Sequence, residues 1–289
     1  MKSRLSARLS LAASLLLAPA IASAEEGYIL AKKGNVPEAG IVRTEKMSSD
    51  LSEATIELKK DDQGIKGSYT HKVNASVVTE GLAAGKARRT LTSKTTEERV
   101  LLGGREQLTP DDGDALQGAP VLLEYKDGAW AATLEEGEAE AGQKTSLDEL
   151  LTELKTDSDP AVYGEAPHKP GDHWDVDLKT LDAYAGIKSP TGSLKVEFVE
   201  VKEIDGIKCA VIKTTFDLQG DSIPNEKGPG MKKKIKGEAE IDRSLTDLAD
   251  MKMNFTCNFT GEGEASEGVT MKIEGPLKVE VSATREKKS

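Results

Sequence analysis

Regular alternation of apolar and polar residues restricts the fold of this chain more than any other feature of its sequence. In residues 251–259 every second side chain is apolar: Met251, Met253, Phe255, Cys257 and Phe259. Successive side chains of a β-strand point to opposite faces, so a period of two indicates a strand with one buried face. The same period recurs in 65–77, 269–273 and 277–281, with a break expected at Gly275-Pro276. Such one-sided strands favour an antiparallel sheet with one face in water.

Short turn motifs join these strands into hairpins. Asp127-Gly128 and Asp205-Gly206 each separate two strand-like segments, and Asp-Gly suits a two-residue turn whose residues both need positive φ. Asp61-Asp62-Gln63-Gly64 predicts a looser turn of the same kind. In 194–204 the apolar residues change from even to odd positions after Phe198, which predicts a β-bulge.

One segment has the period of a helix. Its leucines follow the spacing i, i+3, i+4 and i+7: Leu147, Leu150, Leu151 and Leu154. Ser146 is suited to the N-cap and Glu149 to the capping box, so a helix over 146–156 is predicted. We expect its apolar stripe to pack on the sheet. The predicted fold is mainly β, a curved antiparallel sheet (half-barrel or sandwich-like) with one amphipathic helix packed on its dry face.

The first 24 residues have the composition of a cleavable secretion signal. Lys2, Arg4 and Arg8 precede an apolar stretch, and Ala22-Ser23-Ala24 fits the small-x-small pattern of a cleavage site. The apolar run is shorter than the ~20 residues of a bilayer-spanning helix. We expect 1–24 to be a signal peptide and 25–289 a single β-rich domain that is periplasmic or secreted and soluble. The alternative is two lobes, 25–143 and 165–289, joined by the helix.

Charge excludes one class of partner. Beyond residue 24 the chain holds 36 Lys and Arg against 50 Asp and Glu, which argues against nucleic-acid binding because that relies on clustered bases. No later apolar run reaches membrane-spanning length, so we expect no integral membrane segment after signal removal. Lys232-Lys233-Lys234 is interpreted as a solvated strand entrance, with a docking point for an acidic partner as the alternative.

The two cysteines of the chain, Cys209 and Cys257, allow a single disulfide. Export exposes them to oxidants, and both stand at positions expected to face one core, which favours a bridge between the strands over 207–218 and 251–260. The alternative is two separate thiols that fill the core.

No arrangement of residues indicates catalysis. Segment 168–177 holds His168, His173 and three aspartates, but its Pro-Gly turn is followed by inward-facing Trp174 and Val176 and favours a strand start over a metal site. The sequence has no Gly-x-Ser-x-Gly, no His-Glu-x-x-His and no Gly-rich phosphate loop. His71 is interpreted as structural. We therefore expect no catalytic residue, no metal and no cofactor.

The order of features over 118–178 resembles a group of exported bacterial proteins of unknown function. An apolar strand, an Asp-Gly-x-Trp hairpin and a Leu-rich helix lead to Gly171-Asp172-His173-Trp174, and a Gly-Asp-x-Trp strand start recurs in that group. Segment 237–242 and the strand that follows it are similar to their closing strands. A more distant likeness, of architecture only, is to the curved sheet of periplasmic lipoprotein carriers. Neither resemblance supplies a catalytic residue.

These features favour a non-catalytic binding or carrier protein for an apolar ligand, a lipid or another apolar small molecule held between sheet and helix. The side chains expected to face the ligand are Met251, Met253, Phe255, Leu147, Leu150, Leu151 and Leu154. The alternative is a structural or protein-interaction component of the cell envelope, with an envelope protein as partner. An enzyme with a site of scattered carboxylates is the least favoured interpretation.

Overall fold

The computed structural model describes residues 27–288 apart from 62, 112 and 223–229. The expected signal peptide, 1–24, lies outside the described residues. Across the described chain thirteen strands form one open sheet, and every pair of neighbouring strands is antiparallel. The mainly β, antiparallel fold predicted from the sequence is therefore confirmed.

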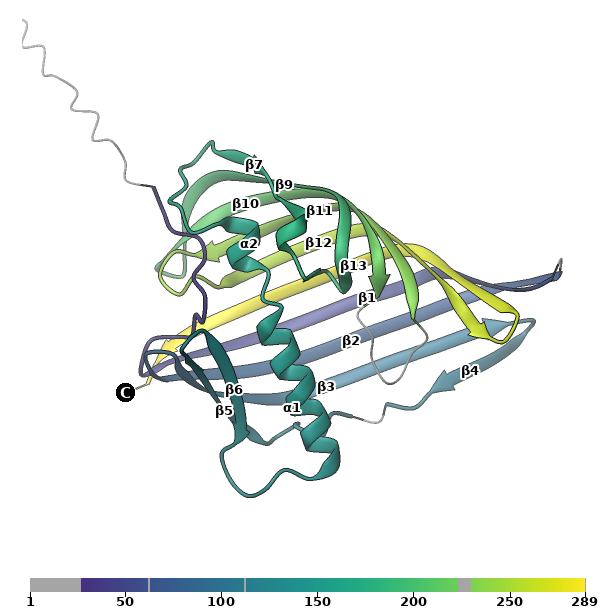
Figure 1. Ribbon diagram of the computed structural model, residues 1–289, viewed down its shortest axis with the longest axis horizontal. Coiled ribbons are helices and arrows are strands. Elements are labelled where there is room, and N and C mark those ends of the chain that lie inside the picture. The colour runs from purple at the N-terminus through teal and green to yellow at the C-terminus, as the bar shows by residue number, and fades with distance from the viewer. Residues whose placement is uncertain (1–26, 62, 112, 223–229, 289) are drawn as a thin grey trace, which may run out of the picture.

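The first and second halves of the chain supply opposite sides of this sheet, whose order is β6-β5-β3-β2-β1-β13-β12-β11-β10-β9-β7, with β4 on β3 and β8 on β9 (Figure 1). The elements are β1 (Ile41–Lys60), β2 (Gln63–Ala83), β3 (Lys86–Leu102), β4 (Arg105–Thr109), β5 (Pro120–Lys126), β6 (Ala129–Leu134), α1 (Ala141–Lys155), α2 (Asp159–Tyr163), β7 (His173–Asp175), η1 (Leu178–Thr180), β8 (Ala183–Tyr184), β9 (Ile187–Ile204), β10 (Ile207–Ser222), β11 (Met231–Ser244), β12 (Asp250–Ser266) and β13 (Val269–Lys287).

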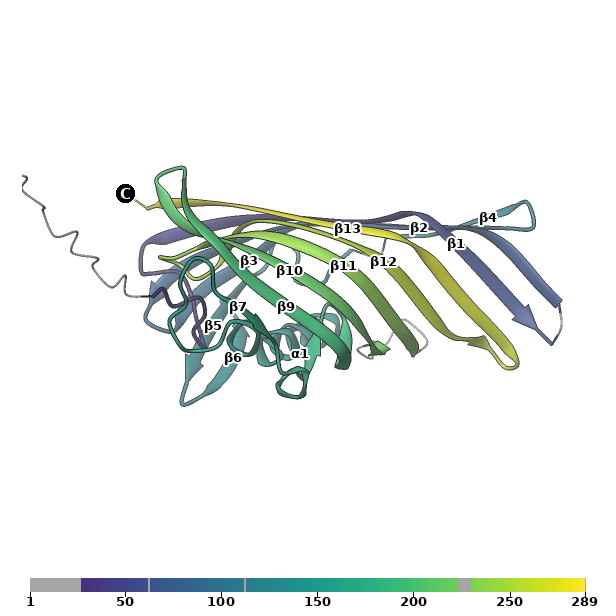
Figure 2. The ribbon, with the colours of Figure 1, turned by 90° about the horizontal axis from the view of Figure 1, so that it is seen from above.

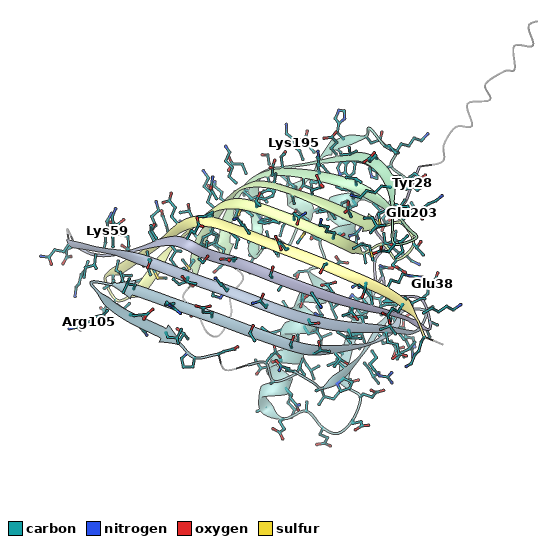
Figure 3. The ribbon with its side chains drawn as sticks, turned by 180° about the vertical axis from the view of Figure 1, so that it is seen from behind. Tyr28, Glu38, Lys59, Arg105, Lys195 and Glu203 are labelled. Carbon is teal, nitrogen blue, oxygen red and sulfur yellow. The ribbon has the colours of Figure 1, made fainter. Side chains whose placement is uncertain are left out.

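The sheet is strongly curved, and its helices lie on the concave side (Figures 1 and 2). Seen from the convex side, the long strands lie in front of the helices (Figure 3). Long strands twist, and bulges bend them further. One such bulge interrupts β1 between Leu51 and Ala54 in its pairing with β2. Another is the predicted one in β9, where Ile212 pairs with Phe198 and Val211 with Glu200, so that Val199 is the extra residue.

The alternation in 251–259 is confirmed, because the odd positions of this segment are buried or half-buried and its even positions are exposed. Phe255 belongs to the largest core cluster, where its ring stacks on Phe216 with centroids 4.8 Å apart. This cluster fills the concave side of β9–β12 beneath α2, whose Val162 and Tyr163 are buried in it.

The two Asp-Gly turns are confirmed. Asp205 and Gly206 have φ of 49° and 80°, and Asp127 and Gly128 have 52° and 82°. The turn predicted at Asp61-Asp62-Gln63-Gly64 is shorter than expected, since β1 ends at Lys60 and β2 begins at Gln63.

The break expected at Gly275-Pro276 is wrong, because β13 runs through it without interruption. Proline lacks the N–H that a sheet ladder needs and is tolerated at irregular positions. Pro276 meets that condition, since the pairing of β1 with β13 is interrupted between Asp50 and Thr55, alongside this proline.

Helix α1 begins five residues before the predicted start. Its N-cap is Glu140 rather than Ser146, and a reciprocal capping box joins Glu140 and Gln143, whose Oε1 accepts a hydrogen bond from the Glu140 N–H at 3.1 Å. Leu147 and Leu150 are buried against Val121 and Leu123 of β5, so the helix packs on the concave side at the β5–β6 end of the sheet. No helix of the described chain combines the length and apolar character needed to cross a bilayer.

The disulfide expected between Cys209 and Cys257 is wrong: both thiols are free and buried. Cys209 pairs with Ser244 and Cys257 with Gly237, positions seven residues apart on β11, or roughly 23 Å along the strand. The two side chains also face opposite sides of the sheet. Phe216 and Cys257 share a face because both pair with Gly237, and Cys209 stands an odd number of residues from Phe216 on β10. Strand β10 is buried on both faces over 209–212, so its sequence did not show which face Cys209 occupies.

Candidate ligand-binding site

Four central strands carry apolar side chains on the concave side that are only half-buried. Directly opposed residues of antiparallel strands share a face, and the registers place Met253, Val281, Met47 and Ala75 in one row across β12, β13, β1 and β2. The adjacent row contains Phe255, so both rows face the same side as the core. We call the half-buried set the apolar trough; it consists of Met47, Val73, Ala75, Val77, Met253, Val279 and Val281.

A cavity of about 280 Å³ extends the trough beneath α1. Its apolar lining combines Met47, Ala75 and Val77 of the trough with Val121 of β5 and Leu150 of α1. Figure 1 shows α1 crossing in front of the strands at this place. The volume is close to the lower end of the range for small-molecule sites, which are concave and mostly apolar. The cavity and the trough are continuous because they share three side chains, and seven of the fifteen residues that line the cavity are polar or charged.

The residues expected to face a ligand do not form a single lining. Met253 and Phe255 pack in the core of β9–β12, and Met251 is buried. Leu147, Leu150 and Leu154 pack on the β5–β6 hairpin, whereas Leu151 is half-buried. Of these seven residues, Met253 belongs to the trough and Leu150 lines the cavity. Sequence reasoning missed Met47 and Ala75, although Val73 and Val77 were already part of a predicted period-two strand.

One end of the trough is formed by arginines that have carboxylate partners. Arg285, Arg43 and Arg89 lie in one cross-strand row, with Thr79 between the last two. Their respective partners are Asp247 at 2.8 Å, Glu45 at 3.5 Å and Glu153 at 3.8 Å.

Beside this row a polar cavity of about 240 Å³ is lined by Arg43, Asp157, Asp159 and Arg243, among other residues. Burial raises the pKa of Asp157, and the neighbouring Asp159 carboxylate adds to the shift. Arg243 is buried, and although burial opposes its charge, the carboxylates of Asp159 and Asp250 raise its pKa above the usual value. This end of the trough is therefore a network of matched charges.

The other end holds Tyr69, His71 and Lys233. The Tyr69 hydroxyl donates a hydrogen bond to Glu98 Oε1 at 3.1 Å, and the Tyr69 and His71 rings are parallel with centroids 6.4 Å apart. Burial lowers the pKa of His71, against the opposing effect of Glu98. Burial also lowers the pKa of Lys233, whose ammonium group donates to the Gly186 carbonyl at 3.2 Å.

Segment 168–177 is a turn that enters strand β7, as predicted. A His168 ring nitrogen lies 2.7 Å from the Tyr163 carbonyl oxygen, and its ring stacks on Trp174 at 4.1 Å. Trp174 Nε1 donates to the Val162 carbonyl at 2.8 Å, which ties β7 to α2. Within the residues that the structure describes, no three His, Cys, Asp or Glu side chains are grouped to hold a metal ion.

No family model and no curated protein matches this chain. Among solved structures it is similar to lipovitellin, described by its lipid-protein interactions, with 10% identity, a TM-score of 0.46 and coverage of 87% of this chain. The chain spans only 26% of lipovitellin.

Two bacterial structures are also similar in outline. A DUF1329 family protein from Desulfovibrio piger has 8% identity, a TM-score of 0.15 and coverage of 83% of each chain. A putative outer membrane lipoprotein-sorting protein domain from Vibrio parahaemolyticus has 8% identity, a TM-score of 0.14 and coverage of 81% of this chain and 84% of that one. The Gly-Asp-x-Trp resemblance and the architectural likeness to lipoprotein carriers stay predictions. Likenesses this weak assign no function.

Proposed function

We propose that this protein is a non-catalytic extracytoplasmic carrier or binding protein whose apolar trough holds the hydrocarbon part of a lipid. The observation that carries the proposal is the set of seven half-buried apolar side chains on the concave side, continuous with the cavity under α1. Contiguous apolar surface that stays open to solvent marks a place where an apolar partner binds.

The chemistry of the trough suits a chain-like ligand with a polar end. Its floor is made of valine, alanine and methionine, and the flexible thioether side chains adapt to irregular apolar surfaces. Covering this floor removes apolar area from water at a gain of roughly 25 cal/mol per Å². Charged and polar groups stand at both ends, so a hydrocarbon chain fits between them and a head group fits at an end.

Removal of the trough surface tests the proposal. Ala75 lies opposite Met47 and lines the cavity, so Ala75→Trp should fill the space that a ligand needs. Asn74, which precedes Ala75 in β2, is exposed on the other face, which makes Asn74→Trp the matched control. In a titration of the delipidated full chain with a fluorescent fatty acid, Ala75→Trp should bind about tenfold more weakly or worse, and Asn74→Trp like the parent. Equal binding by both variants contradicts the trough as the site.

A bound native ligand can be detected directly by its mass. Protein purified from its own host under mild conditions should show, by native mass spectrometry, mass increments that disappear after extraction with organic solvent. A chain that carries no increment and binds no lipid probe is not a lipid carrier.

The extracytoplasmic location is supported by the composition of residues 1–24 and by the Ala22-Ser23-Ala24 motif. N-terminal sequencing of exported protein should begin at Glu25. Exported material that retains Met1 contradicts cleavage.

A further inference from the structure

The basic run of β11 is divided between the two faces of the sheet. Lys232, Lys234 and Lys236 are exposed, whereas Lys233 is half-buried. Lys233 has the parity of Ile235, Ala239 and Ile241, which are buried on the concave side. Lys233 is therefore the one lysine of the run that faces the concave side.

Lys233 has no carboxylate partner within the described chain. Its one direct polar contact there is the Gly186 carbonyl, a neutral acceptor at 3.2 Å. Partial removal of an ammonium group from water costs free energy unless an opposite charge compensates it. This cost is visible as the lowered pKa of Lys233, for which burial is the cause. A titratable group that is shifted by burial and faces the open concave side is a candidate for binding an opposite charge.

Lys233 faces His71 across the concave side. In sheet order β1, β13 and β12 separate their strands, β2 and β11. The registers nevertheless place Lys233 in one row with Gly261, Ile273 and Ile56, and His71 lies opposite Leu51. Leu51, Ile56 and Ile273 form one buried cluster, so Lys233 and His71 lie at the same end of the concave side. The charge of Lys233 accordingly contributes to the lowered pKa of His71, after burial and against Glu98. Glu98 itself accepts the hydrogen bond of Tyr69.

His71 borders the apolar trough, and Lys233 lies six residues along β11 from Ala239, which pairs with Phe255 beside the trough, or roughly 20 Å. On β2, His71 shares its face with Val73 and Ala75, and Ala75 lies four positions further along the strand, or roughly 13 Å. At the opposite end each arginine of the row has a carboxylate partner. Among the described cations at the two ends whose side chains are buried or half-buried, Lys233 is the one that lacks a carboxylate partner; Lys32, beside the arginine row, also lacks one but is exposed. An anionic group would therefore gain the most binding free energy at the Lys233 end of the trough.

We infer that the ligand is an anionic amphiphile whose head group, a carboxylate or a phosphate, pairs with Lys233 while its hydrocarbon chain lies in the trough. This inference rests on the proposed function and makes it more specific. Charge-assisted hydrogen bonds to an ammonium group are short and about twice as strong as neutral ones, so the head group adds both affinity and orientation.

Three probes with the same hydrocarbon chain test the inference on the delipidated full chain: oleate, oleoyl lysophosphatidate and the uncharged monoolein. The parent should bind at least one of the anionic probes about tenfold more tightly than monoolein. Lys233→Met should lose that preference and bind monoolein unchanged, and Lys233→Arg should retain part of it. Lys234→Met, from the same run but on the convex face, is the matched control and should behave like the parent.

The anionic probe that loses more affinity in Lys233→Met identifies the head group as carboxylate or phosphate. If the parent binds all three probes equally, or if Lys233→Met keeps the preference, the inference is overturned and the proposed function stands. If the parent binds none of the probes, the proposed function fails and the inference with it. Equal binding of monoolein by parent and Lys233→Met verifies that the variant is folded.

Discussion

Arg243 Nη1 lies 2.6 Å from Asp250 Oδ1 although the arginine side chain is only 2% exposed. The same guanidinium donates to Asp159 at the start of α2, to the Leu30 carbonyl at 2.6 Å and to the Leu248 carbonyl at 2.8 Å. One side chain thus ties α2 and the N-terminal segment to the sheet, and these elements cover the core beside the trough.

Arg243→Met should therefore destabilise the protein by about 3–5 kcal/mol, because it leaves two aspartates without their buried partner. Arg99→Met is the control: Arg99 also pairs with two carboxylates, Glu97 and Glu106, but its side chain is 49% exposed. Exposed pairs contribute about 0–1 kcal/mol. Denaturant unfolding measures both variants, and similar losses would show that the Arg243 network is not a structural tie.

The register of β12 predicts opposite outcomes for neighbouring residues. Phe255 is 8% exposed and stacks on Phe216, so Phe255→Ala should cost about 3–5 kcal/mol. Asn254 is exposed on the convex face, and Asn254→Ala should stay within about 0.5 kcal/mol. Equal unfolding midpoints for the two variants would mean that the register is wrong.

The sequence allowed prediction of strands whose inward positions are mostly apolar. β12 was predicted from strict alternation, and the two Asp-Gly turns and the bulge at Val199 were predicted from local chemistry alone. Strand β3 was not predicted, because its concave positions include Lys94, Thr96 and Glu98 and alternation is therefore weak. Its place in the sheet depends on pairing with β2 over 67–83, which no local pattern indicates.

The same cause hid the candidate site. Part of the concave side is open to solvent, so polar residues such as Glu45 and Ser49 occur there beside Met47. The trough side of β1 therefore lacks the apolar period of a core strand. Leu147 and Phe255 were expected to meet because both belong to apolar stripes, but pairing places their elements in separate clusters. The inward orientation of Lys233 follows from strand parity but was hidden within a run of lysines.

Thiol chemistry checks the correction to the cysteine pairing. Unfolded protein that has not been reduced should titrate with two thiols, since neither Cys209 nor Cys257 is bonded. In the native state both should react slowly with iodoacetamide at pH 8, because burial raises the pKa of Cys209 to about 11 and that of Cys257 to about 12. Recovery of no free thiol after unfolding would restore the disulfide.

His71 should make stability depend on pH in a defined window. Its pKa is lowered in the folded state by burial, so both states are neutral above the ordinary value of 6.5 and the stability is full there. As the pH falls below 6.5 the unfolded chain binds a proton first, and stability declines until the folded-state pKa is reached, by at most about 1.4 kcal/mol per pH unit. His71→Gln should remove this part of the decline in a series of denaturant unfolding curves from pH 7.5 to pH 5, and an unchanged decline would show that His71 is not its cause.

Titration of the imidazole also tests whether Lys233 faces His71. The charge of Lys233 lowers the pKa of His71, so Lys233→Met should move the His71 midpoint in an NMR titration upward, toward its ordinary value. Lys234→Met removes an equal charge from the convex face, where the sheet lies between it and His71, and should leave the midpoint in place. Glu98 acts on His71 in the opposite direction, so Glu98→Gln should move the midpoint downward. Equal midpoints in Lys233→Met and Lys234→Met would show that Lys233 does not face His71, and the head-group end of the trough would lose its geometric basis.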